Sequence, residues 1–161
     1  RNIGYVGNCR NEDRYNGYLD TLKRNNLDLI PEYVVETNQT EKEGYEAMEQ
    51  LLKSDDCPTG IYCANDITAV GMLKYLGRCR NLYFTPSIIA SDDIEEAQYT
   101  KPMLTTVGLP KEEMGKFALY LLLDRMKGGP SGVVRMELSG HLMIRNSCSH
   151  VSESTWSDYC I

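Results

Sequence analysis

The stretch "IYCANDITAVG", Ile61–Gly71, indicates the fold of the whole chain. An apolar run ends at two small polar residues, Asn65 and Asp66, and apolar residues then return at helical spacing. This change of period predicts a buried strand that leads directly into a helix. One polar side chain at such a junction is enough to cap the helix, because Asn or Asp accepts hydrogen bonds from the unpaired backbone amides of the first turn. The second polar side chain is left for another role.

The same change of period occurs on both sides of this stretch. Strand patterns cover residues 2–7, 32–37, 60–64 and 86–91, and amphipathic helical patterns cover residues 12–26, 41–53 and 66–77. Strands that alternate with helices predict right-handed crossovers and an α/β fold, with a doubly wound parallel sheet covered on both faces. In such sheets the ligand site lies outside the carboxyl ends of the strands.

Composition and charge narrow the class of protein. The 161 residues are 42% hydrophobic, enough to predict one buried core. The net charge of −6 argues against direct binding of nucleic acid by this chain. No apolar run approaches the ~20 residues that cross a bilayer, and no export signal opens the sequence. We therefore expect a soluble chain without a membrane partner.

The six cysteines are irregularly spaced, and no C-x-x-C pair occurs among them. With only His141 and His150 available beside them, the sequence predicts no metal site. We expect free thiols in a reducing cytosol. A disulfide near the tail is the alternative, because Cys148 and Cys160 are close in the sequence.

Polar side chains follow each of the four predicted strands. Amide, guanidinium and carboxylate groups that converge on one sheet edge supply the donors and acceptors that a polyhydroxylated small molecule needs. The alternatives are local, because Arg14 has Glu12 and Asp13 as neighbours for an exposed salt bridge, and Asp92 is a typical turn carboxylate. The residues are Asn8, Asn11 and Arg14 after the first strand, Thr37, Asn38 and Gln39 after the second, Asn65 and Asp66 after the third, and Ser91, Asp92 and Asp93 after the fourth.

Motifs for catalysis and for nucleotide cofactors are missing from the sequence. Neither a G-x-G-x-x-G motif nor a P-loop follows the first strand, so no phosphate cradle is expected. No G-x-S-x-G elbow occurs, and neither histidine has an identifiable nucleophile or base beside it. We expect no enzyme activity and no cofactor, since a hydrolase or transferase would need a nucleophile with a paired base.

Four blocks of the sequence resemble one family in order and in spacing. "GIYCANDITAVGMLKYL" resembles the A-N-D-x-x-A-x-G signature of the lac-repressor-like (LacI/GalR) transcription regulators. "IIASDDIEEAQYTKPMLTTVGLPKEEMGKFALYLLLDRM" resembles the next block of their effector-binding domain, "HLMIRNSC" its closing strand, and "RYNGYLDTL" its R-x-x-G-F helix. The resemblance spans residues 1–148. It departs at Ala90–Ser91, where the family usually has Gly-Phe before the paired aspartates.

The resemblance implies a truncated fold of the periplasmic-binding-protein-like type I class, in which two lobes clamp a small molecule. Residues 1–108 would form the C-terminal lobe, residues 109–139 a crossover helix and strand that pack in the missing N-terminal lobe, and residues 140–161 the return strand and tail. The hinge would lie at Gly108, Leu109 and Pro110.

The resemblance also implies a function and a set of site residues. Arg14, Asn65 and Asp92 match positions that hold effector hydroxyls, Gln39 matches a pocket position more loosely, and Asp66 is left as the helix cap. The protein would be a cytoplasmic, homodimeric, sugar-responsive regulator that contacts DNA only through a headpiece absent from this chain. The alternative is a periplasmic solute-binding protein of a sugar uptake system, which would need an export signal.

The segment after the fourth strand, "LPKEEMGKFALYLLLDRMKGG", is apolar on nearly all sides of its predicted helix. A helix of this kind must be buried on more than one side. Three arrangements would bury this helix: it folds back on the sheet of its own chain, exchanges with a second copy, or associates through its exposed face. Of these we predict self-association. The helix at Ile67–Leu76 is the family's dimer surface and would add to the contact.

Overall fold

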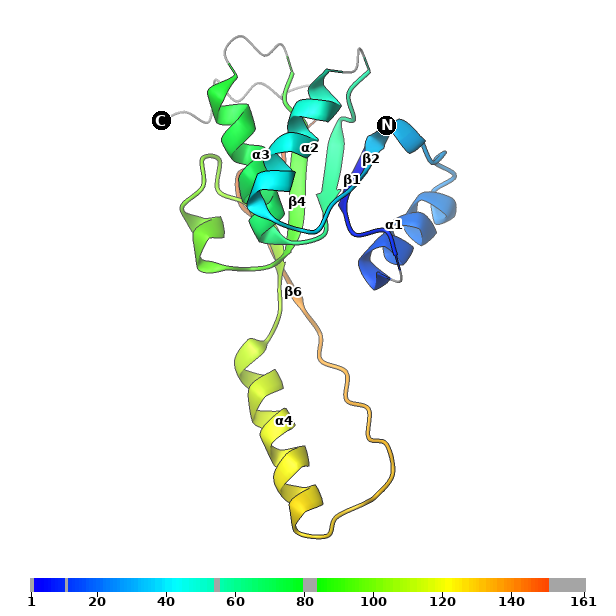
Figure 1. Ribbon diagram of the computed structural model, residues 1–161, viewed down its shortest axis with the longest axis vertical. Helices are drawn as coiled ribbons and strands as arrows, with labels where there is room; N and C mark the ends of the chain where they lie inside the picture. Colours follow the sequence, from blue (N-terminus) through cyan, green and yellow to red (C-terminus); the bar gives the residue numbers. More distant parts are fainter. Residues whose placement is uncertain (1, 11, 54–55, 80–83, 151–161) are drawn as a thin grey trace.

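The computed structural model describes residues 2–10, 12–53, 56–79 and 84–150 and contains one six-stranded sheet. The strand order is β2-β1-β3-β4-β5-β6, and every neighbouring pair is parallel except β5 and β6, which are antiparallel. The predicted alternation of strands and helices is confirmed, the closing strand expected in "HLMIRNSC" forms as β6, and β5 is an additional strand between β4 and β6 (Figure 1). The strands are β1 (Ile3–Gly7), β2 (Val34–Glu36), β3 (Gly60–Cys63), β4 (Ser87–Asp92), β5 (Thr105–Gly108) and β6 (His141–Met143).

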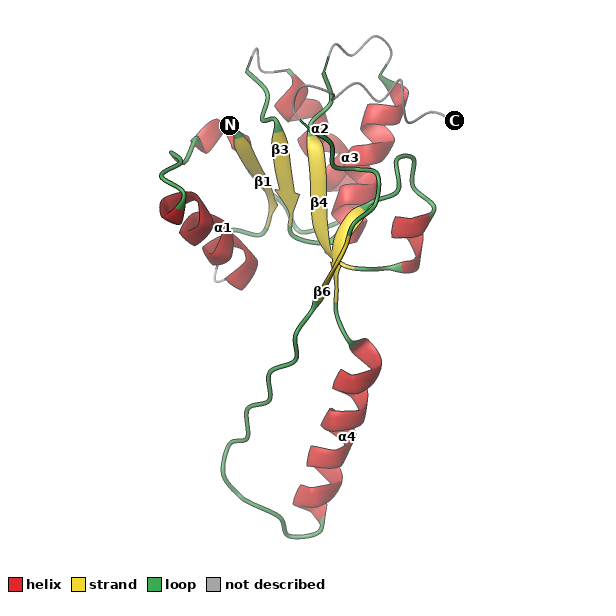
Figure 2. Cartoon of the chain, turned by 180° about the vertical axis from the view of Figure 1, so that it is seen from behind, coloured by secondary structure: helices red, strands yellow, loops and turns green. Residues whose placement is uncertain are grey.

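Helices cover both faces of the sheet. The side chains of α2 and α3 pack on one face against Val6, Ile61 and Ile88, and α1 packs on the other face against Tyr5. Figure 2 shows α1 on one side of the strands, apart from α2 and α3. The helices are α1 (Asp13–Arg24), α2 (Glu41–Leu52), α3 (Asp66–Arg78) and α4 (Lys111–Met126), with short 3₁₀ turns η1 (Pro31–Tyr33) and η2 (Glu95–Gln98).

Two glycines let α2 and α3 approach closely. A Cβ atom added at Gly44 would lie 2.0 Å from the carbonyl oxygen of Thr68, and one added at Gly71 would lie 1.9 Å from that of Glu41. Neither distance leaves room for a side chain. The close approach holds the start of α3, and with it Asn65 and Asp66, in a fixed position at the sheet edge.

On the face of the sheet that α1 covers, tyrosine side chains pack together. The ring of Tyr5 lies 5.0 Å from that of Tyr15, 5.4 Å from that of Tyr18 and 5.8 Å from that of Tyr62, measured between centroids. Aromatic contacts of this kind add to the apolar area that the rings bury. They fix α1, whose first turn carries Arg14, over the end of β1.

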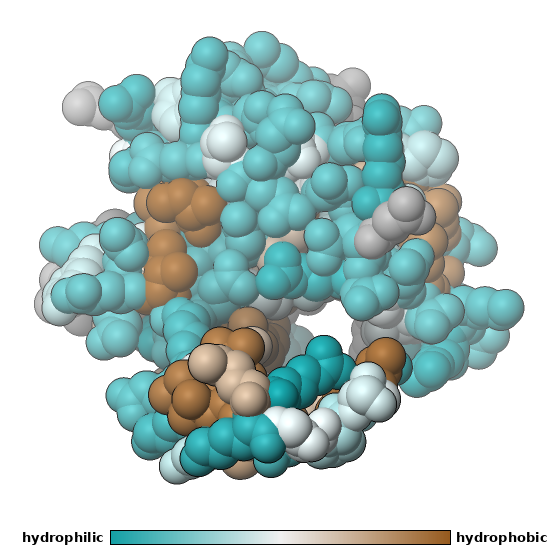
Figure 3. All heavy atoms as spheres, turned by 60° about the horizontal axis from the view of Figure 1, so that its bottom comes forward, coloured by the Kyte–Doolittle hydropathy of each residue, from teal (hydrophilic) through white to brown (hydrophobic). Residues whose placement is uncertain are grey.

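Residues 109–140, which we call the arm, extend away from the rest of the chain (Figures 1 and 2). We call the described residues 2–108 and 141–150 the lobe. No residue of α4 is buried, so the helix does not fold back on the sheet. Figure 3, with the arm brought forward, shows apolar side chains on its surface. The most exposed large ones are Met114, Leu119, Tyr120, Leu122 and Met126 of α4, and Val133 and Val134 beyond it.

The strand expected at residues 132–138 does not form. This segment has no regular secondary structure, and its Val133 is 97% exposed. A strand is stabilised by backbone hydrogen bonds to a neighbouring strand and by a buried face, and no described residue supplies either to this segment.

The thiols of Cys9, Cys57, Cys63, Cys79 and Cys148 are free, whereas Cys160 lies outside the described residues. Within the described part of the chain, no helix combines the length and the hydropathy that a membrane span needs.

Candidate functional site

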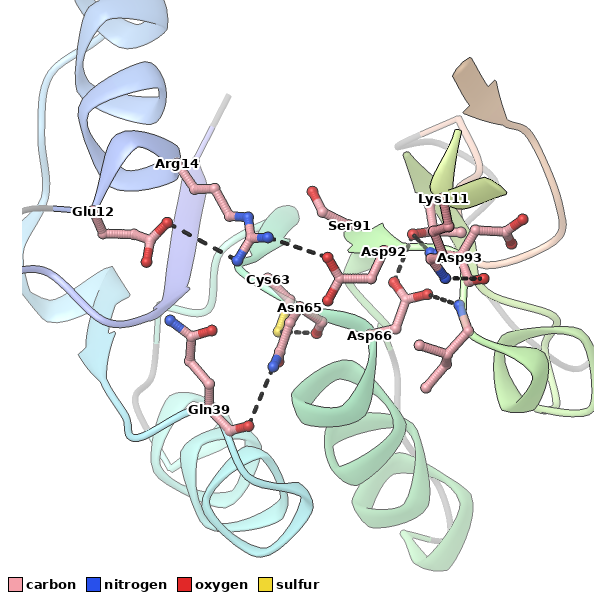
Figure 4. Close-up of polar contacts among 12 residues, drawn as sticks. Glu12, Arg14, Gln39, Cys63, Asn65, Asp66, Ser91, Asp92, Asp93 and Lys111 are labelled. Atoms are coloured by element: carbon pink, nitrogen blue, oxygen red, sulfur yellow. Dashed lines mark hydrogen bonds and ion pairs between the residues drawn. The ribbon is translucent and has the colours of Figure 1, made fainter. Parts of the chain in front are cut away.

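The candidate site lies at the carboxyl edge of the sheet, where β4 ends in an unusual turn. Asp92 and Asp93 both adopt positive φ, at 123° and 48°. This region of φ is rare for residues other than glycine, although Asp and Asn enter it more readily than most. The turn directs the Asp92 side chain toward the end of β1 and α1 (Figure 4).

Arg14 and Asp92 meet across this edge, as the sequence predicted from their positions after two different strands. Nη2 of Arg14 donates to Oδ1 of Asp92 at 3.1 Å, and the two side chains are 31% and 28% exposed. The local alternative also occurs, but at a longer distance, because Nη1 of Arg14 lies 3.9 Å from Oε1 of Glu12. Burial raises the pKa of Asp92, while the positive charges of Arg14 and Lys111 lower it in part. The pair is therefore fixed, yet still open to solvent.

The helix cap predicted at the start of α3 has to be corrected from Asp66 to Asn65. Asn65 is the helix cap, because its backbone is extended and its Oδ1 accepts from the amide of Thr68 at 3.2 Å. Its Nδ2 donates to the backbone oxygen of Gln39 at 3.2 Å. Asn65 still lies at the same edge as Arg14 and Asp92, but both ends of its amide are already engaged within the chain (Figure 4).

Asp66 is not the cap, since it lies one residue inside the helix and its side chain is fully buried. Its Oδ1 accepts from Oγ1 of Thr106 at 2.5 Å, and its Oδ2 accepts from the amide of Ile94 at 2.9 Å. Burial raises the pKa of Asp66, and these two hydrogen bonds partly offset the effect. The carboxylate therefore ties α3 to β5 and to the turn after β4. The paired polar residues indicated this place in the fold but not which of the two would cap the helix.

The polar residues after β2 are partly used within their own loop. Asn38 is bound to Glu43 through its backbone amide and through its side chain, the latter at 2.8 Å. Gln39 has a positive φ of 61°, and its side chain extends toward the space between Glu12 and Asn65 (Figure 4). Of the residues after β1, Asn8 accepts from the amide of Arg10 at 2.7 Å. Asn11 lies outside the described residues.

Several contacts at the edge were not predicted. Oγ of Ser91 lies 3.2 Å from the hydroxyl oxygen of Tyr62, so the chain has a hydroxyl pair where the resemblance predicts an aromatic side chain. Arg145 and Lys111 both contact Asp93. Spacing could not have indicated Arg145, because it reaches the edge from the far end of the chain.

The cluster offers the guanidinium of Arg14, the carboxylates of Glu12 and Asp92 and the side-chain amide of Gln39 at one open edge. These groups suit hydroxyl groups of a ligand, because a carboxylate accepts and a guanidinium donates two hydrogen bonds in one plane. Among the residues that the structure describes, no three His, Cys, Asp or Glu side chains are arranged to hold a metal ion. A separate groove of about 490 Å³ runs along α3 and η2, away from this cluster.

Residues 1–148 match the periplasmic binding protein-like domain family. The chain is 35% identical over 136 residues to the HTH-type transcriptional repressor CytR of Escherichia coli K12, a match that covers 83% of this chain and 40% of that protein. A solved complex of the transcriptional regulator CelR with cellobiose superimposes with a TM-score of 0.82 at 27% identity, over 92% of this chain and 47% of that one. A LacI-family regulator from Enterococcus faecium with bound ribose superimposes with a TM-score of 0.79 at 26% identity, over 91% and 56%.

The chain spans less than half the length of the curated relatives that it matches first, and these relatives are transcriptional repressors. Its lobe has the six-stranded sheet of a periplasmic-binding-protein-like fold, partial with respect to those relatives. The chain belongs to the periplasmic binding protein-like domain family, as part of the effector-binding domain of a LacI-family regulator.

Proposed function

We propose that the edge formed by Arg14, Asp92 and Gln39 binds a neutral, polyhydroxylated effector, a sugar or a sugar-containing molecule, and that the full-length protein is a transcription repressor. The observation that carries this proposal is the Arg14–Asp92 pair, which joins the first turn of α1 to the end of β4, 78 residues apart, and remains partly exposed. The bound cellobiose and ribose of two similar regulators support the class of ligand. The repressors among the relatives favour this role over solute uptake.

The charges at the edge favour a neutral ligand. Arg14 and Asp92 neutralise each other, and Glu12 adds a further negative charge beside them. An anionic ligand would meet both carboxylates, and a cationic ligand would meet the guanidinium. Adjacent hydroxyl groups avoid either repulsion, because they donate to the carboxylate and accept from the guanidinium.

We infer that residues 1–108 are the C-terminal lobe of a two-lobed domain, and that residues 140–161 return to it. On this reading, α4 and residues 127–139 pack in the other lobe, which would cover the exposed apolar side chains of the arm. Gly108, Leu109 and Pro110 would then form the hinge. Ligand binding between the lobes would change DNA affinity only if the ligand prefers one arrangement of the lobes.

We further propose that the full-length protein is a homodimer that works beside the chromosome, in the cytoplasm. The groove along α3 and η2 is lined by Ile67, Val70 and Leu73, with Tyr99 at its rim 74% exposed. Its apolar lining suits a second copy of the same surface. Tyr99→Lys should convert a dimer to a monomer in sedimentation, whereas an unchanged mass would contradict the proposal.

The effector proposal is tested by Asp92→Ala in the full-length protein, with ribose, cellobiose and a wider set of neutral sugars as probes in titration calorimetry. Loss of a hydrogen bond to a charged group costs about 1.5–3 kcal/mol, so affinity should fall at least about tenfold. Binding to the DNA upstream of its own gene should persist. Asp28→Ala is the matched control, because Asp28 is an exposed carboxylate before β2, at the opposite end of the sheet.

Two outcomes would overturn the proposal. Equal sugar affinity in Asp92→Ala and in the unmodified protein would remove Asp92 from the site. Simultaneous loss of sugar and DNA binding, with a lower unfolding temperature than Asp28→Ala, would assign Asp92 a folding role instead.

A further inference from the structure

Asp93, directly after the candidate ligand residue Asp92, is held by contacts from three segments. Oδ1 of Asp93 lies 2.5 Å from Nη2 of Arg145, and its backbone oxygen accepts from Nζ of Lys111 at 3.1 Å. Its amide donates to Oγ1 of Thr106 at 3.4 Å. Figure 4 shows Lys111 and Asp93 together on the side of Asp92 away from Arg14.

The Arg145–Asp93 pair is better shielded than the other ion pairs of the lobe. The Arg145 side chain is 11% exposed and that of Asp93 23%, whereas the Lys74–Glu41 pair between α3 and α2 is 55% and 44% exposed. Arg145 is itself fixed, because its Nη1 donates to the backbone oxygen of Leu104 at 2.8 Å. A shielded and fully bonded pair resists rearrangement more than an exposed one.

The backbone at this turn needs such support. Asp92 and Asp93 have φ of 123° and 48°, and residues held in sparsely populated regions persist only where the surrounding structure constrains them. The contacts of Asp93 supply this constraint on one side of Asp92. Arg14 supplies a contact on the other side, through the Asp92 side chain.

The partners of Asp93 lie on both connections between the lobe and the arm. Lys111 is the first residue of α4, and Arg145 follows β6, where the chain returns from the arm. One residue next to the candidate ligand carboxylate therefore contacts the outgoing and the returning segment. A movement of the arm would change the contacts of Asp93 before those of any other residue at the edge.

We propose that Asp93, clamped by Arg145 and Lys111, is a positioning residue that sets the direction of the Asp92 carboxylate and couples it to the arm. This inference rests on the proposed function, because it takes Asp92 as the effector contact. It assigns to Asp93 no contact with the ligand. The aspartate pair is divided in role, with one carboxylate facing the ligand edge and the other fixed to the connections.

The experiment uses Arg145→Met in the full-length protein, which removes the guanidinium, keeps the aliphatic stem and leaves Asp92 and Arg14 in place. Lys53→Met is the matched control, because it breaks the 3.1 Å pair with Glu49 at the C-terminal end of α2, away from the edge and from the groove along α3. Hydrogen exchange is measured at the amides of Asp93, Ile94 and Met114, all of which donate hydrogen bonds. Sugar affinity is measured by calorimetry with the sugars that bind the unmodified protein.

We expect Arg145→Met to speed exchange at these three amides at least tenfold relative to β1 and β3, and to weaken sugar binding at least tenfold. Lys53→Met should do neither, and Arg145→Lys should restore part of both. Unchanged exchange at Asp93 and Ile94, or an equal increase throughout the sheet, would overturn the positioning role. If no sugar binds the unmodified protein, the sugar proposal fails while the exchange result still decides this one. If Arg145→Met does not fold, Lys111→Met carries the same two measurements.

Discussion

The helices α3 and α4 have similar apolar content and opposite surroundings. In α3, 8 of 13 residues are buried, and in α4 none of 16. The amide of Thr68 in the first turn of α3 is capped by the Asn65 side chain, whereas Pro110, directly before α4, supplies no side-chain cap. Gly71 in α3 has no room for a Cβ, while Gly115 in α4 has no atom within 4 Å of that position. The lobe is thus a packed unit, whereas the arm exposes an apolar surface.

This difference shows where the stability of the chain resides. The lobe buries its apolar side chains in two clusters, one on each face of the sheet. The arm contributes helix propensity alone, and isolated helices of this length are marginal in water. Changes in the lobe should therefore alter the folding equilibrium, and changes in the arm should alter association.

The largest effect is expected from the arm itself. Each Leu-sized side chain gains about 1.5–3 kcal/mol on burial, so several exposed ones on α4 favour association by many times the thermal energy. The 161-residue chain should therefore give a mass above that of the 18.3 kDa monomer in light scattering at micromolar concentration. Phe117→Glu combined with Leu122→Glu should reduce that mass.

Leu29→Glu is the control, because Leu29 is also exposed, at 44%, but belongs to the lobe. It should leave association unchanged. A monomer at micromolar concentration for the unmodified chain would contradict this reading of the arm.

The next effect is expected at the closest approach within the lobe. Gly71→Ala puts a Cβ where the carbonyl oxygen of Glu41 lies 1.9 Å away, so α2 and α3 must separate. Overpacking of this kind costs about 3 kcal/mol or more of unfolding free energy in urea titration. Gly17→Ala in α1, with no atom within 4 Å of the new Cβ, should instead stabilise by about 0.5–1 kcal/mol. The same sign for both variants would refute the close packing of α2 on α3.

Most of the lobe could be predicted from the sequence, because its strands and helices have clear and different periods. The helical pattern over residues 66–77 puts Ala69, Met72, Leu73 and Leu76 on one face, and all four are buried. The convergence of Arg14 and Asp92 followed from the parallel sheet alone. β5 begins with two threonines and lacks the apolar pattern of a buried strand, whereas β6 lies in the stretch that the resemblance predicts as the closing strand.

The errors share a physical cause, which is that contacts across the fold decided the outcome. Asn65 and Asp66 are both good caps by residue type, and the assignment depended on which side chain reached Thr106 and Ile94. The segment at residues 132–138 has strand-forming residues but no neighbouring strand in the described chain. The contact of Arg145 with Asp93 depends on the path by which the chain returns from the arm through β6.

A smaller effect, with a pH dependence, is expected for Asp66. Its pKa is raised in the folded state, so the folded chain keeps a proton that the unfolded chain has released. The contribution of Asp66 to stability is therefore largest below the usual carboxyl pKa and falls as the pH rises through the raised value. Asp66→Asn leaves a buried donor unpaired and should cost about 1–3 kcal/mol. The cost should grow as the pH is lowered from about 7 toward about 4, measured by urea unfolding.

Asp92 has a raised pKa as well, so the unmodified chain and Asp66→Asn share its pH dependence. Only the difference between the two curves reports on Asp66. A difference that shrinks as the pH falls would contradict the sign derived from burial.

The smallest effect separates the two uses of Asn65. Asn65→Ser keeps an oxygen that caps α3 but is too short to reach the backbone oxygen of Gln39, so stability should change by less than about 0.5 kcal/mol. Asn65→Ala loses the cap as well and should cost about 1 kcal/mol, as should Ile88→Val, which removes a buried methyl group near the start of β4, away from the edge. Sugar binding by the full-length protein then distinguishes the roles. If Asn65 orients the loop of Gln39 toward the ligand, Asn65→Ser should weaken sugar affinity as much as Asn65→Ala does, whereas Ile88→Val should leave it unchanged. Affinity that instead follows stability across the three variants would reduce Asn65 to a helix cap.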